Sequence, residues 1–369
     1  MSKQDFNSSE IQRYSRQLNL KEVGIEGQKK LKNSKVICVG SGGLGSPVLL
    51  YLAAAGVGKL GIVDSDKVEE SNLHRQIIHS MEWINRPKVE SAIYRIKEIN
   101  PYCNVEVFNE SLNTNNALDF LKDFDIICDC TDNFPTRYLI NDACVILGKP
   151  NIYGSIAGFE GQASVFNLTE KSPNYRDLLP NPPPRELLPS CAEAGVLGVI
   201  PGIIGLIQAN EAIKIILNLG EVLDGRILIF NSLSMKFREL TLKKDPNNSQ
   251  IKDLINYEDF CSKYDLKNEI KYIRSKDLKI LMQKNIDDLY ILDVRENHES
   301  KEKNIDHTVS IPLSEIINGK AVESIKKDAE GKTIYVYCKS GIRSKKAIIE
   351  LGKHNLTAIN IDGGMDAWM

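Results

Sequence analysis

Several residue patterns are missing from this chain of 369 residues, and each absence excludes a class of protein. The eight cysteines form no CxxC pair and the five histidines bracket no cysteine pair, so a structural zinc site lacks obvious ligands. The start of the chain, residues 1–10, is polar and contains no apolar signal core. The longest apolar stretch, Gly195–Ala209, is too short to span a bilayer and predicts a turn followed by a buried helix.

Net charge and cysteine content bear on the cellular compartment and on the classes of partner. The formal net charge is -2, which does not favour a nucleic-acid binder. Scattered cysteines in a long chain without an export signal are typical of reduced thiols rather than of a disulfide framework. We therefore expect a cytoplasmic protein with neither a membrane nor a nucleic-acid partner.

Short apolar runs alternate with helical patterns in residues 35–150, which predicts a parallel sheet with covering helices. The runs are Val36–Val39, Leu60–Val63, Val105–Phe108 and Asp125–Cys130, and the helical segments include Pro47–Ala55 and Lys88–Ile99. After residue 151, Gly154–Phe166 and Arg226–Leu242 predict longer antiparallel strands, with a helix around Gly205–Leu219 between them. The predicted fold class is α/β, a Rossmann-like parallel sheet continued by antiparallel strands.

A loop, a linker and a second α/β pattern follow. Six prolines in residues 172–190 predict a surface loop without regular structure. The polar segment Lys243–Asp253 predicts the start of a linker, and a smaller α/β domain is expected beyond it. The apolar runs of that second pattern are Tyr290–Val294, Thr333–Cys338 and Ala358–Ile361. We expect domains at residues 1–248 and 272–369, joined by a linker over residues 249–271.

A glycine-rich loop follows the first predicted strand and precedes a helix. Its glycines let the backbone approach a phosphate, and the helix N-terminus that follows favours negative charge. Asp64 ends the next strand, where a carboxylate can accept hydrogen bonds from ribose hydroxyls. Alone, this arrangement predicts only a nucleotide in a Rossmann-like crevice, and a dinucleotide dehydrogenase is an equal alternative. The candidate loop residues are Gly40, Gly42, Gly43, Leu44 and Gly45.

Polar residues beyond the loop favour a triphosphate over a dinucleotide. Arg75 and Lys88 supply cations for phosphates, and Asp132 follows a strand, where a carboxylate can bind Mg²⁺. A hydride-transfer site does not need that many cations, although either cation taken singly is as easily a solvated surface residue. The candidate nucleotide-binding residues after the loop are Asp64, Asp66, Asn72, Arg75, Gln76, Lys88, Asp132 and Asn133.

Six segments together resemble the MoeB/ThiF/HesA family of E1-like activating enzymes, over roughly residues 10–242. They are Arg13–Gln17, the Gly40 loop, Ser71–Gln76, Pro87–Ser91, Thr131–Phe134 and Cys191–Gly198. The resemblance implies that ATP and the Gly-Gly carboxylate of a small ubiquitin-like sulfur-carrier protein give an acyl-adenylate and pyrophosphate. It also implies that Asp64 holds ribose, that Arg75 and Lys88 hold phosphates, and that Asp132 binds Mg²⁺. Arg16 would reach the phosphates of the neighbouring subunit in a homodimer.

Many members of that family hold zinc with two CxxC pairs, and this chain departs from them. The corresponding segments, Pro173–Pro180 and Asp245–Gln250, carry Asn, Asp and Ser where the thiolates would stand. These side chains do not make a tetrahedral soft-ligand site. We therefore predict that the protein holds no structural zinc.

Cys338 lies at the end of an apolar strand, before a short glycine-containing loop and a helix. The backbone N–H groups of such a loop and the helix dipole stabilise an anion, which favours a thiolate or a persulfide. Arg343 adds positive charge at the rim. Four residues separate Cys338 from Arg343; phosphatase loops of this kind have one more, so the smaller ring favours sulfur over phosphate. Asp293 and Arg295 are interpreted as a structural pair.

With three further segments, the Cys338 loop resembles the rhodanese family over about residues 272–369. Those segments are Leu292–Arg295, Ile311–Ser314 and Gly363–Trp368. The fused arrangement is similar to that of MoeZ-type and Uba4/MOCS3-type proteins. It implies that a Cys338 persulfide, loaded by a cysteine desulfurase, attacks the adenylate and that the resulting acyl disulfide is cleaved by Cys191 to release a thiocarboxylate.

Two alternatives remain open at the level of sequence. The chain is either such a sulfur-transfer enzyme or a ubiquitin-type activator that forms a thioester on Cys191, a residue that also fits a small packed side chain. A third interpretation is an adenylating enzyme whose rhodanese-like domain only docks a sulfur donor. The pathway that the carrier serves, whether molybdopterin, thiamine or another, does not follow from the residues.

Overall fold

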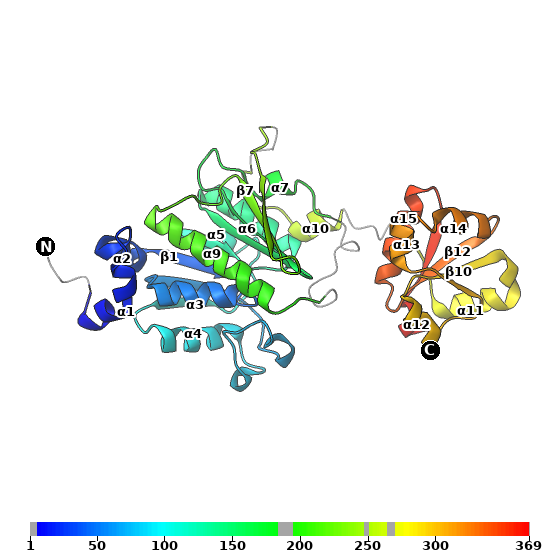
Figure 1. The fold of residues 1–369 in the computed structure, drawn as a ribbon, viewed down its shortest axis with the longest axis horizontal. Helices are drawn as coiled ribbons and strands as arrows, with labels where there is room; N and C mark the ends of the chain where they lie inside the picture. The colour runs from blue at the N-terminus through cyan, green and yellow to red at the C-terminus, as the bar shows by residue number, and fades with distance from the viewer. Residues whose placement is uncertain (1–5, 184–194, 247–250, 264–269, 369) are drawn as a thin grey trace. The chain divides into compact units, whose positions relative to one another are not determined.

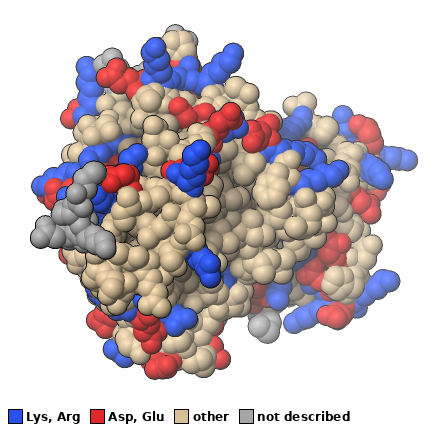
Figure 2. Space-filling view, turned by 60° about the vertical axis from the view of Figure 1, so that its left-hand side comes forward, with Lys and Arg blue, Asp and Glu red and all other residues tan. Residues whose placement is uncertain are grey.

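The computed structural model describes residues 6–183, 195–246, 251–263 and 270–368. The chain forms two compact units, and each contains a sheet of its own (Figure 1). The first unit extends to Cys261, and Ser262 begins the second. Basic and acidic side chains are interspersed around broad uncharged areas on the face in Figure 2, in keeping with the net charge of -2.

The first unit is built on an eight-stranded sheet in the order β3-β2-β1-β4-β5-β6-β7-β8. Strands β3 to β5 in that order run parallel, and the pairs β5–β6, β6–β7 and β7–β8 are antiparallel. The predicted fold class is therefore confirmed. The strands are β1 Lys35–Val39, β2 Lys59–Val63, β3 Asn104–Phe108, β4 Ile126–Asp129, β5 Asn151–Ala157, β6 Glu160–Phe166, β7 Arg226–Asn231 and β8 Lys236–Thr241.

Two details of the predicted first unit were wrong. Each of the two regions expected to be one long strand is a hairpin, because a tight turn divides it; at the first turn Gly158 has φ +57°, a conformation that favours glycine. The proline-rich segment contains a short helix, α7, Tyr175–Leu178. Its prolines flank the helix rather than interrupt it, and Asn174 caps the helix in a reciprocal arrangement with Asp177.

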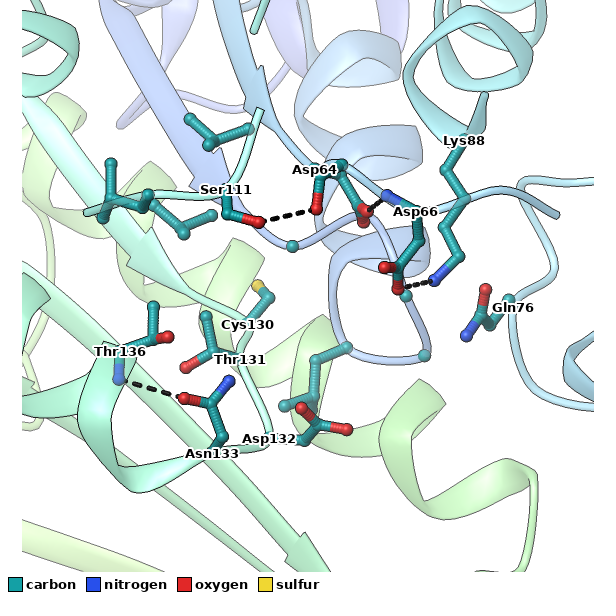
Figure 3. A pocket seen from close by; sticks show the side chains of 18 of the residues that line it. Asp64, Asp66, Gln76, Lys88, Ser111, Cys130, Thr131, Asp132, Asn133 and Thr136 are labelled. Carbon is teal, nitrogen blue, oxygen red and sulfur yellow. Dashed lines mark hydrogen bonds and ion pairs between the residues drawn. The ribbon is translucent and has the colours of Figure 1, made fainter. Parts of the chain in front are cut away.

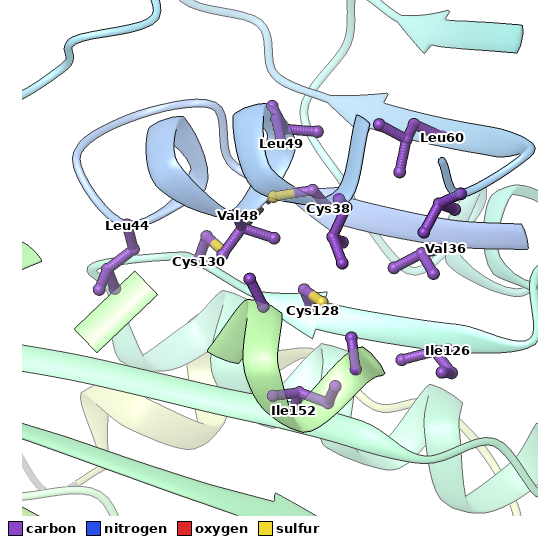
Figure 4. Packing of buried hydrophobic residues seen from close by; sticks show 14 of the residues in the cluster. Val36, Cys38, Leu44, Val48, Leu49, Leu60, Ile126, Cys128, Cys130 and Ile152 are labelled. Carbon is purple, nitrogen blue, oxygen red and sulfur yellow. Dashed lines mark hydrogen bonds between the residues drawn. The ribbon is translucent and has the colours of Figure 1, made fainter. Parts of the chain in front are cut away.

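Helices cover both faces of the large sheet. Helices α3, α4 and α9 pack on one face around a core that includes Val48, Leu49 and Leu60. Figure 4 shows Val48 of this core between Cys38 and Cys130. Helices α5, α6, α7 and α10 contribute to the core on the other face. The helices are α1 Ser8–Leu18, α2 Gly24–Asn33, α3 Gly45–Ala55, α4 Lys88–Ile99, α5 Ala117–Leu121, α6 Phe134–Leu147, α9 Val199–Leu217 and α10 Tyr257–Ser262.

Helix α9, Val199–Leu217, continues beyond the apolar stretch Gly195–Ala209 that the sequence suggested. By length and composition it is the one helix in the described ranges that is apolar enough to cross a bilayer. In the structure it lies along strands β5 and β6, and its own residues Ile200, Ile204 and Ala212 are fully buried. The apolar residues on the face of α9 that meets the sheet are therefore explained by packing against β5 and β6.

Helix α10 lies within the segment predicted to be a linker, and it packs on the first unit. The Tyr257 hydroxyl donates to Asp142 Oδ2 at 2.8 Å, and Arg176 makes two hydrogen bonds to the same carboxylate, at 2.9 and 2.7 Å. Asp142 is almost fully buried, so these three donors satisfy a charge that would otherwise be costly. Through Arg176 on α7 and Tyr257 on α10, this network ties both helices to Asp142 on α6.

The second unit contains a five-stranded sheet in the order β11-β10-β12-β13-β9, with every pair parallel. The strands are β9 Lys271–Ile273, β10 Leu289–Asp293, β11 Thr308–Ser310, β12 Thr333–Tyr337 and β13 Ala358–Ile361. The helices are α11 Ser275–Lys284, α12 Asn297–Glu302, α13 Leu313–Ile317, α14 Val322–Asp328 and α15 Ile342–Lys353. The three strands that the sequence predicted are present, and the three-residue strands β9 and β11 extend the sheet at its edges.

Candidate functional site

A cavity of about 270 Å³ lies at the carboxyl ends of β1, β2, β3 and β4. In Figure 3, Asp64, Asp66 and Lys88 line one side of it, and Asp132 and Asn133 line the other. Of the predicted nucleotide-binding residues, the structure brings eleven to this cavity: Gly40, Gly42, Gly43, Leu44, Asp64, Asp66, Arg75, Gln76, Lys88, Asp132 and Asn133. Ligands bind at this edge of parallel sheets because the strand ends and helix N-termini converge there.

The glycine loop lines the cavity, and some of its backbone N–H groups donate no hydrogen bond within the described residues. Gly40 has φ +93°, which allows the chain to turn sharply at the end of β1. Within the described residues, the N–H groups of Gly42, Gly43 and Leu44 donate no hydrogen bond. They stand at the N-terminus of α3, where the helix dipole favours an anion. The loop can therefore cradle a phosphate group.

Asp64 and Asp66 lie at the end of β2 and are already organised. Asp64 Oδ2 accepts the Ser41 N–H at 2.8 Å and the Ser41 hydroxyl at 2.9 Å, which ties the carboxylate to the glycine loop. Asp66 forms an ion pair with Lys88 at 2.8 Å. Lys88 is 5% exposed at the start of α4, so this cation is held at the cavity wall rather than in solvent.

Arg75 and Gln76 bring a second cation and an unfilled acceptor. Asn72 does not line the cavity; its Oδ1 accepts a hydrogen bond from Arg75 Nη2 at 2.9 Å and so orients the guanidinium. Gln76 is buried, and its Oε1 has no hydrogen-bond partner among the described residues. A buried acceptor without a donor costs about 1–3 kcal/mol, which a ligand donor would recover.

The turn after β4 presents Asp132 to the cavity. Buried Asp129 accepts both the N–H and the hydroxyl of Thr131, at 3.0 and 2.7 Å, and this fixes the turn. Asp132 itself is exposed and, in the described part of the chain, makes neither an ion pair nor a hydrogen bond. An unpaired carboxylate beside the amide of Asn133 is a donor set that suits a hard cation such as Mg²⁺.

Sequence reasoning missed His79, which supports the loop from behind. His79 Nε2 lies 3.1 Å from the Ser41 carbonyl oxygen and Nδ1 lies 3.0 Å from Ser91 Oγ. Because a carbonyl only accepts, Nε2 is the protonated nitrogen and Nδ1 accepts from Ser91. Burial lowers the pKa of His79 to about 4, so the ring is neutral near pH 7. Only the three-dimensional packing of α4 against the loop reveals this contact.

Besides Asn72, three predicted site residues lie outside the cavity lining or outside the described ranges. Gly45 is the first residue of α3, where a Cβ would stand 2.0 Å from the Gly40 carbonyl oxygen, so its part is structural. Arg16 is exposed on α1 and is not among the cavity residues. Cys191 lies outside the described residues.

The Cys338 loop occupies the equivalent position in the second unit, between β12 and α15. Cys338 is 1% exposed, and its sulfur accepts the Gly341 N–H at 3.1 Å and faces the Ser344 hydroxyl at 3.6 Å. The N–H groups of Met365 and Asp366 donate to the Cys338 and Lys339 carbonyls, at 2.8 and 3.0 Å. The loop is therefore fixed around a sulfur that lies at a helix N-terminus, a setting that favours an anion.

Arg343 is paired with a carboxylate at the rim of this loop. It donates to both oxygens of Glu299 on α12, at 2.6 and 2.8 Å, and these hydrogen bonds lower the pKa of Glu299 to about 2. Asp293 and Arg295 form a buried pair with contacts of 2.6 to 3.0 Å. That pair lies at the end of β10, so its geometry fits the structural interpretation.

Comparison with known proteins identifies both units. The family model described as the ThiF family matches residues 14–251, and the model of the rhodanese-like domain matches residues 276–369. A probable adenylyltransferase/sulfurtransferase MoeZ of Mycobacterium tuberculosis is 44% identical over 373 residues, covering 98% of this chain and 94% of the relative. Adenylyltransferase and sulfurtransferase MOCS3 of Drosophila grimshawi is 40% identical and covers 100% of this chain and 86% of the relative.

Further similarity covers the first unit. A sulfur carrier protein adenylyltransferase of Thermus thermophilus is 46% identical over 266 residues, which is 69% of this chain and 98% of the relative. Among solved structures, Escherichia coli MccB with a MccA peptide aligns with a TM-score of 0.58 at 22% identity, over 68% of this chain and 77% of that one. At that identity the MccB likeness supports the fold alone.

We predict that stability depends on pH through His79. Its pKa falls from 6.5 to about 4 on folding, so the unfolded chain takes up the proton first as the pH is lowered. The contribution of His79 to the free energy of unfolding is fully present above pH 6.5. It falls by roughly 3 kcal/mol as the pH is lowered toward 4. Urea denaturation across this range should show a smaller loss in His79→Gln than in the parent protein. His74→Gln, which changes an exposed ring, is the control; equal pH slopes in all three proteins would contradict the prediction.

Proposed function

This chain belongs to the ThiF family and carries a C-terminal rhodanese-like domain, and from that premise we propose that it activates a small ubiquitin-like sulfur-carrier protein. It is an adenylyltransferase and a sulfurtransferase in one chain. In the proposed reaction, ATP adenylates the C-terminal Gly-Gly carboxylate of the carrier and a persulfide on Cys338 then converts the adenylate into a thiocarboxylate.

The cavity in the first unit is the observation that carries the adenylation step. It combines backbone donors that are free within the described residues, at a helix N-terminus, with two cations in its lining, Arg75 and Lys88. A triphosphate needs both, because its charge is spread over several oxygens and grows on the departing pyrophosphate. Asp64, at the end of β2, would hold the ribose hydroxyls. Asp132 and Asn133 would hold Mg²⁺, which supplies charge stabilisation at the phosphates.

The chemistry follows from the poor reactivity of a carboxylate at neutral pH. A carrier carboxylate oxygen attacks the α-phosphorus of ATP, so that pyrophosphate leaves and AMP becomes a good leaving group. The cations stabilise the departing charge, and no side chain needs to transfer a proton in this step. The neutral imidazole of His79 holds the loop backbone and does not take part.

The second unit supports the sulfur-transfer step. A persulfide on Cys338 would attack the acyl carbon and release AMP, leaving the carrier attached through an acyl disulfide. A thiol, for which Cys191 is our candidate, would then attack the Cys338 sulfur; this releases the thiocarboxylate and leaves a disulfide between the two cysteines. We further propose that a cysteine desulfurase supplies the sulfur, and that the protein works in the cytoplasm.

Replacing Cys338 separates the two half-reactions. Cys338→Ala should keep ATP–pyrophosphate exchange with the carrier, because that cavity lies in the first unit, and should abolish thiocarboxylate formation measured by mass spectrometry. Cys103→Ala, which changes a buried cysteine far from either loop in sequence, is the matched control and should keep both activities. Thiocarboxylate formed at the parent rate by Cys338→Ala would show that the rhodanese-like domain is not the donor.

We also propose that Arg16 acts in the cavity of a second copy of the chain. Helix α1 packs where α3 and α4 end: Gln17 donates to the Ala55 carbonyl at 3.0 Å, and Arg13 to the Ile99 carbonyl at 2.6 Å. The cavity lies at the other end of these helices, and α3, with 11 residues, is about 16 Å long. Arg16 therefore lies far from the cavity of its own chain, and in a homodimer it would reach the cavity of the partner chain instead.

Mixing two inactive variants tests that arrangement. Arg16→Ala and Asp132→Ala should each fold and lose pyrophosphate exchange. In a mixed dimer one cavity keeps Asp132 and receives an intact Arg16 from the other chain, so exchange should return to about a quarter of the parent rate. Exchange retained by Arg16→Ala alone, or no recovery after subunit mixing, would contradict the proposal.

Finally, we propose that no structural zinc is needed. The segments Pro173–Pro180 and Asp245–Gln250 carry oxygen and amide side chains in place of thiolates, and Arg176 in the first of them belongs to the Asp142 network. Within the described residues, no group of three or more metal-binding side chains is present. Elemental analysis of purified protein should therefore find no stoichiometric zinc, and one zinc per chain would overturn this part of the proposal.

A further inference from the structure

Asn360 is a buried amide without a partner beside the sulfur loop. It lies on β13 and is 1% exposed, and neither its Oδ1 nor its Nδ2 has a hydrogen-bond partner among the described residues. Leaving such a group unsatisfied costs about 1–3 kcal/mol. Val336 and Ala358, its neighbours on the same face of the sheet, are apolar core residues. An apolar side chain at position 360 would pack there without that cost.

The strand register places Asn360 directly under the Cys338 loop. Asn360 pairs with Val336 on β12, and residues two apart on a strand share a face, so Cys338 is the diagonal neighbour of Asn360. Asn360 Nδ2 lies 3.6 Å from the point at which Gly341 would carry a Cβ. The amide therefore packs against the residue whose N–H points at the Cys338 sulfur.

The rest of the loop has its own anchors. The carbonyls of Cys338 and Lys339 are held by the N–H groups of Met365 and Asp366. Gly341 has φ +99° and is the residue at which the loop turns into α15. Its N–H is committed to the Cys338 sulfur, at 3.1 Å. The peptide at Gly341 is therefore the part of the loop that must respond when the sulfur changes.

We propose that Asn360 is a positioning residue for sulfur transfer, the amide that holds the Gly341 peptide when Cys338 carries a second sulfur. The inference rests on the proposed function of Cys338. A persulfide moves the negative charge one sulfur outward, and the loop N–H groups turn toward it because they follow the charge. The free amide of Asn360 then supplies the hydrogen bond that steadies the moved peptide. The Asn360 amide therefore lacks a partner when Cys338 is unmodified and gains one when Cys338 carries the persulfide.

Two variants of equal shape test the amide in the full-length protein. Asn360→Val removes the donor, and Asn360→Thr restores a hydroxyl donor on nearly the same outline. Transfer of sulfur to cyanide, with thiosulfate as the probe donor, should fall about twofold to tenfold in kcat for Asn360→Val, the range expected for a hydrogen bond to a neutral peptide group. The KM for thiosulfate should change little, and Asn360→Thr should recover part of the rate.

A matched control comes from Tyr290, whose buried hydroxyl also lacks a partner among the described residues of this unit. Tyr290 pairs with Ile334 on β12, four residues before Cys338, so it lies away from the loop. Tyr290→Phe and Asn360→Val should both melt at or above the parent temperature, because each loses an unsatisfied polar group. Only Asn360→Val should lose sulfur transfer, and pyrophosphate exchange should be unchanged in both.

The outcomes separate this inference from the proposed function. A parent-like kcat in Asn360→Val, or a loss of rate that accompanies an equal loss of stability, would overturn the positioning role. If the parent protein gains no 32-dalton sulfur adduct on Cys338 after exposure to thiosulfate, the proposed sulfur chemistry of the domain fails instead.

Discussion

The close approach of the backbone at the turn between β1 and α3 is the constraint on which the nucleotide cavity depends. A Cβ on Gly45 would stand 2.0 Å from the Gly40 carbonyl oxygen, and a Cβ on Gly40 would stand 2.9 Å from the Cys130 carbonyl oxygen. Only glycine permits both contacts at once. Because the turn is this tight, the N–H groups of Gly42, Gly43 and Leu44 donate no hydrogen bond within the described residues, and Asp64 is close enough to hold Ser41.

A polar layer behind the loop keeps that arrangement in place. It links Ser91 on α4 through His79 to Ser41 and on to Asp64 at the end of β2, with each step between 2.8 and 3.1 Å. The imidazole in this layer is neutral near pH 7, because burial disfavours the charged ring and the nearby cation of Lys88 lowers the His79 pKa further. Burial supplies that neutrality, so the packing of α4 sets both the shape and the charge of the loop.

The sequence predicted those parts of the molecule that repeat a local pattern. Apolar runs bounded by Gly or Asp marked the central strands of both sheets, and the glycine loop with its strand-end acids located most of the cavity lining, because strand ends of a parallel sheet must meet at one edge. His79 and the Glu299–Arg343 pair were not predictable, since each joins residues that only tertiary packing brings together. Helix α7 was missed for a different reason, because the number of prolines in a segment does not say where they fall. The four residues Tyr175–Leu178 lie between Pro173 and Pro180 and suffice for one capped turn.

The two units repeat one device, a parallel strand that ends in a glycine-containing turn at a helix N-terminus, but they surround it with different charges. At the first, Arg75 and Lys88 face the cavity, which suits the several charges of a triphosphate. At the second, Glu299 neutralises Arg343, so what faces Cys338 is chiefly neutral N–H and O–H donors. A persulfide carries a single charge, and neutral donors hold it without the strong field that would also attract phosphate. Among the described residues, each turn also has buried amide atoms without a hydrogen-bond partner: Oε1 of Gln76 at the first, and both Oδ1 and Nδ2 of Asn360 at the second. Such a cost is tolerated where a passing charge completes the hydrogen bonds, whereas the fully paired Asp293 and Arg295 stay structural.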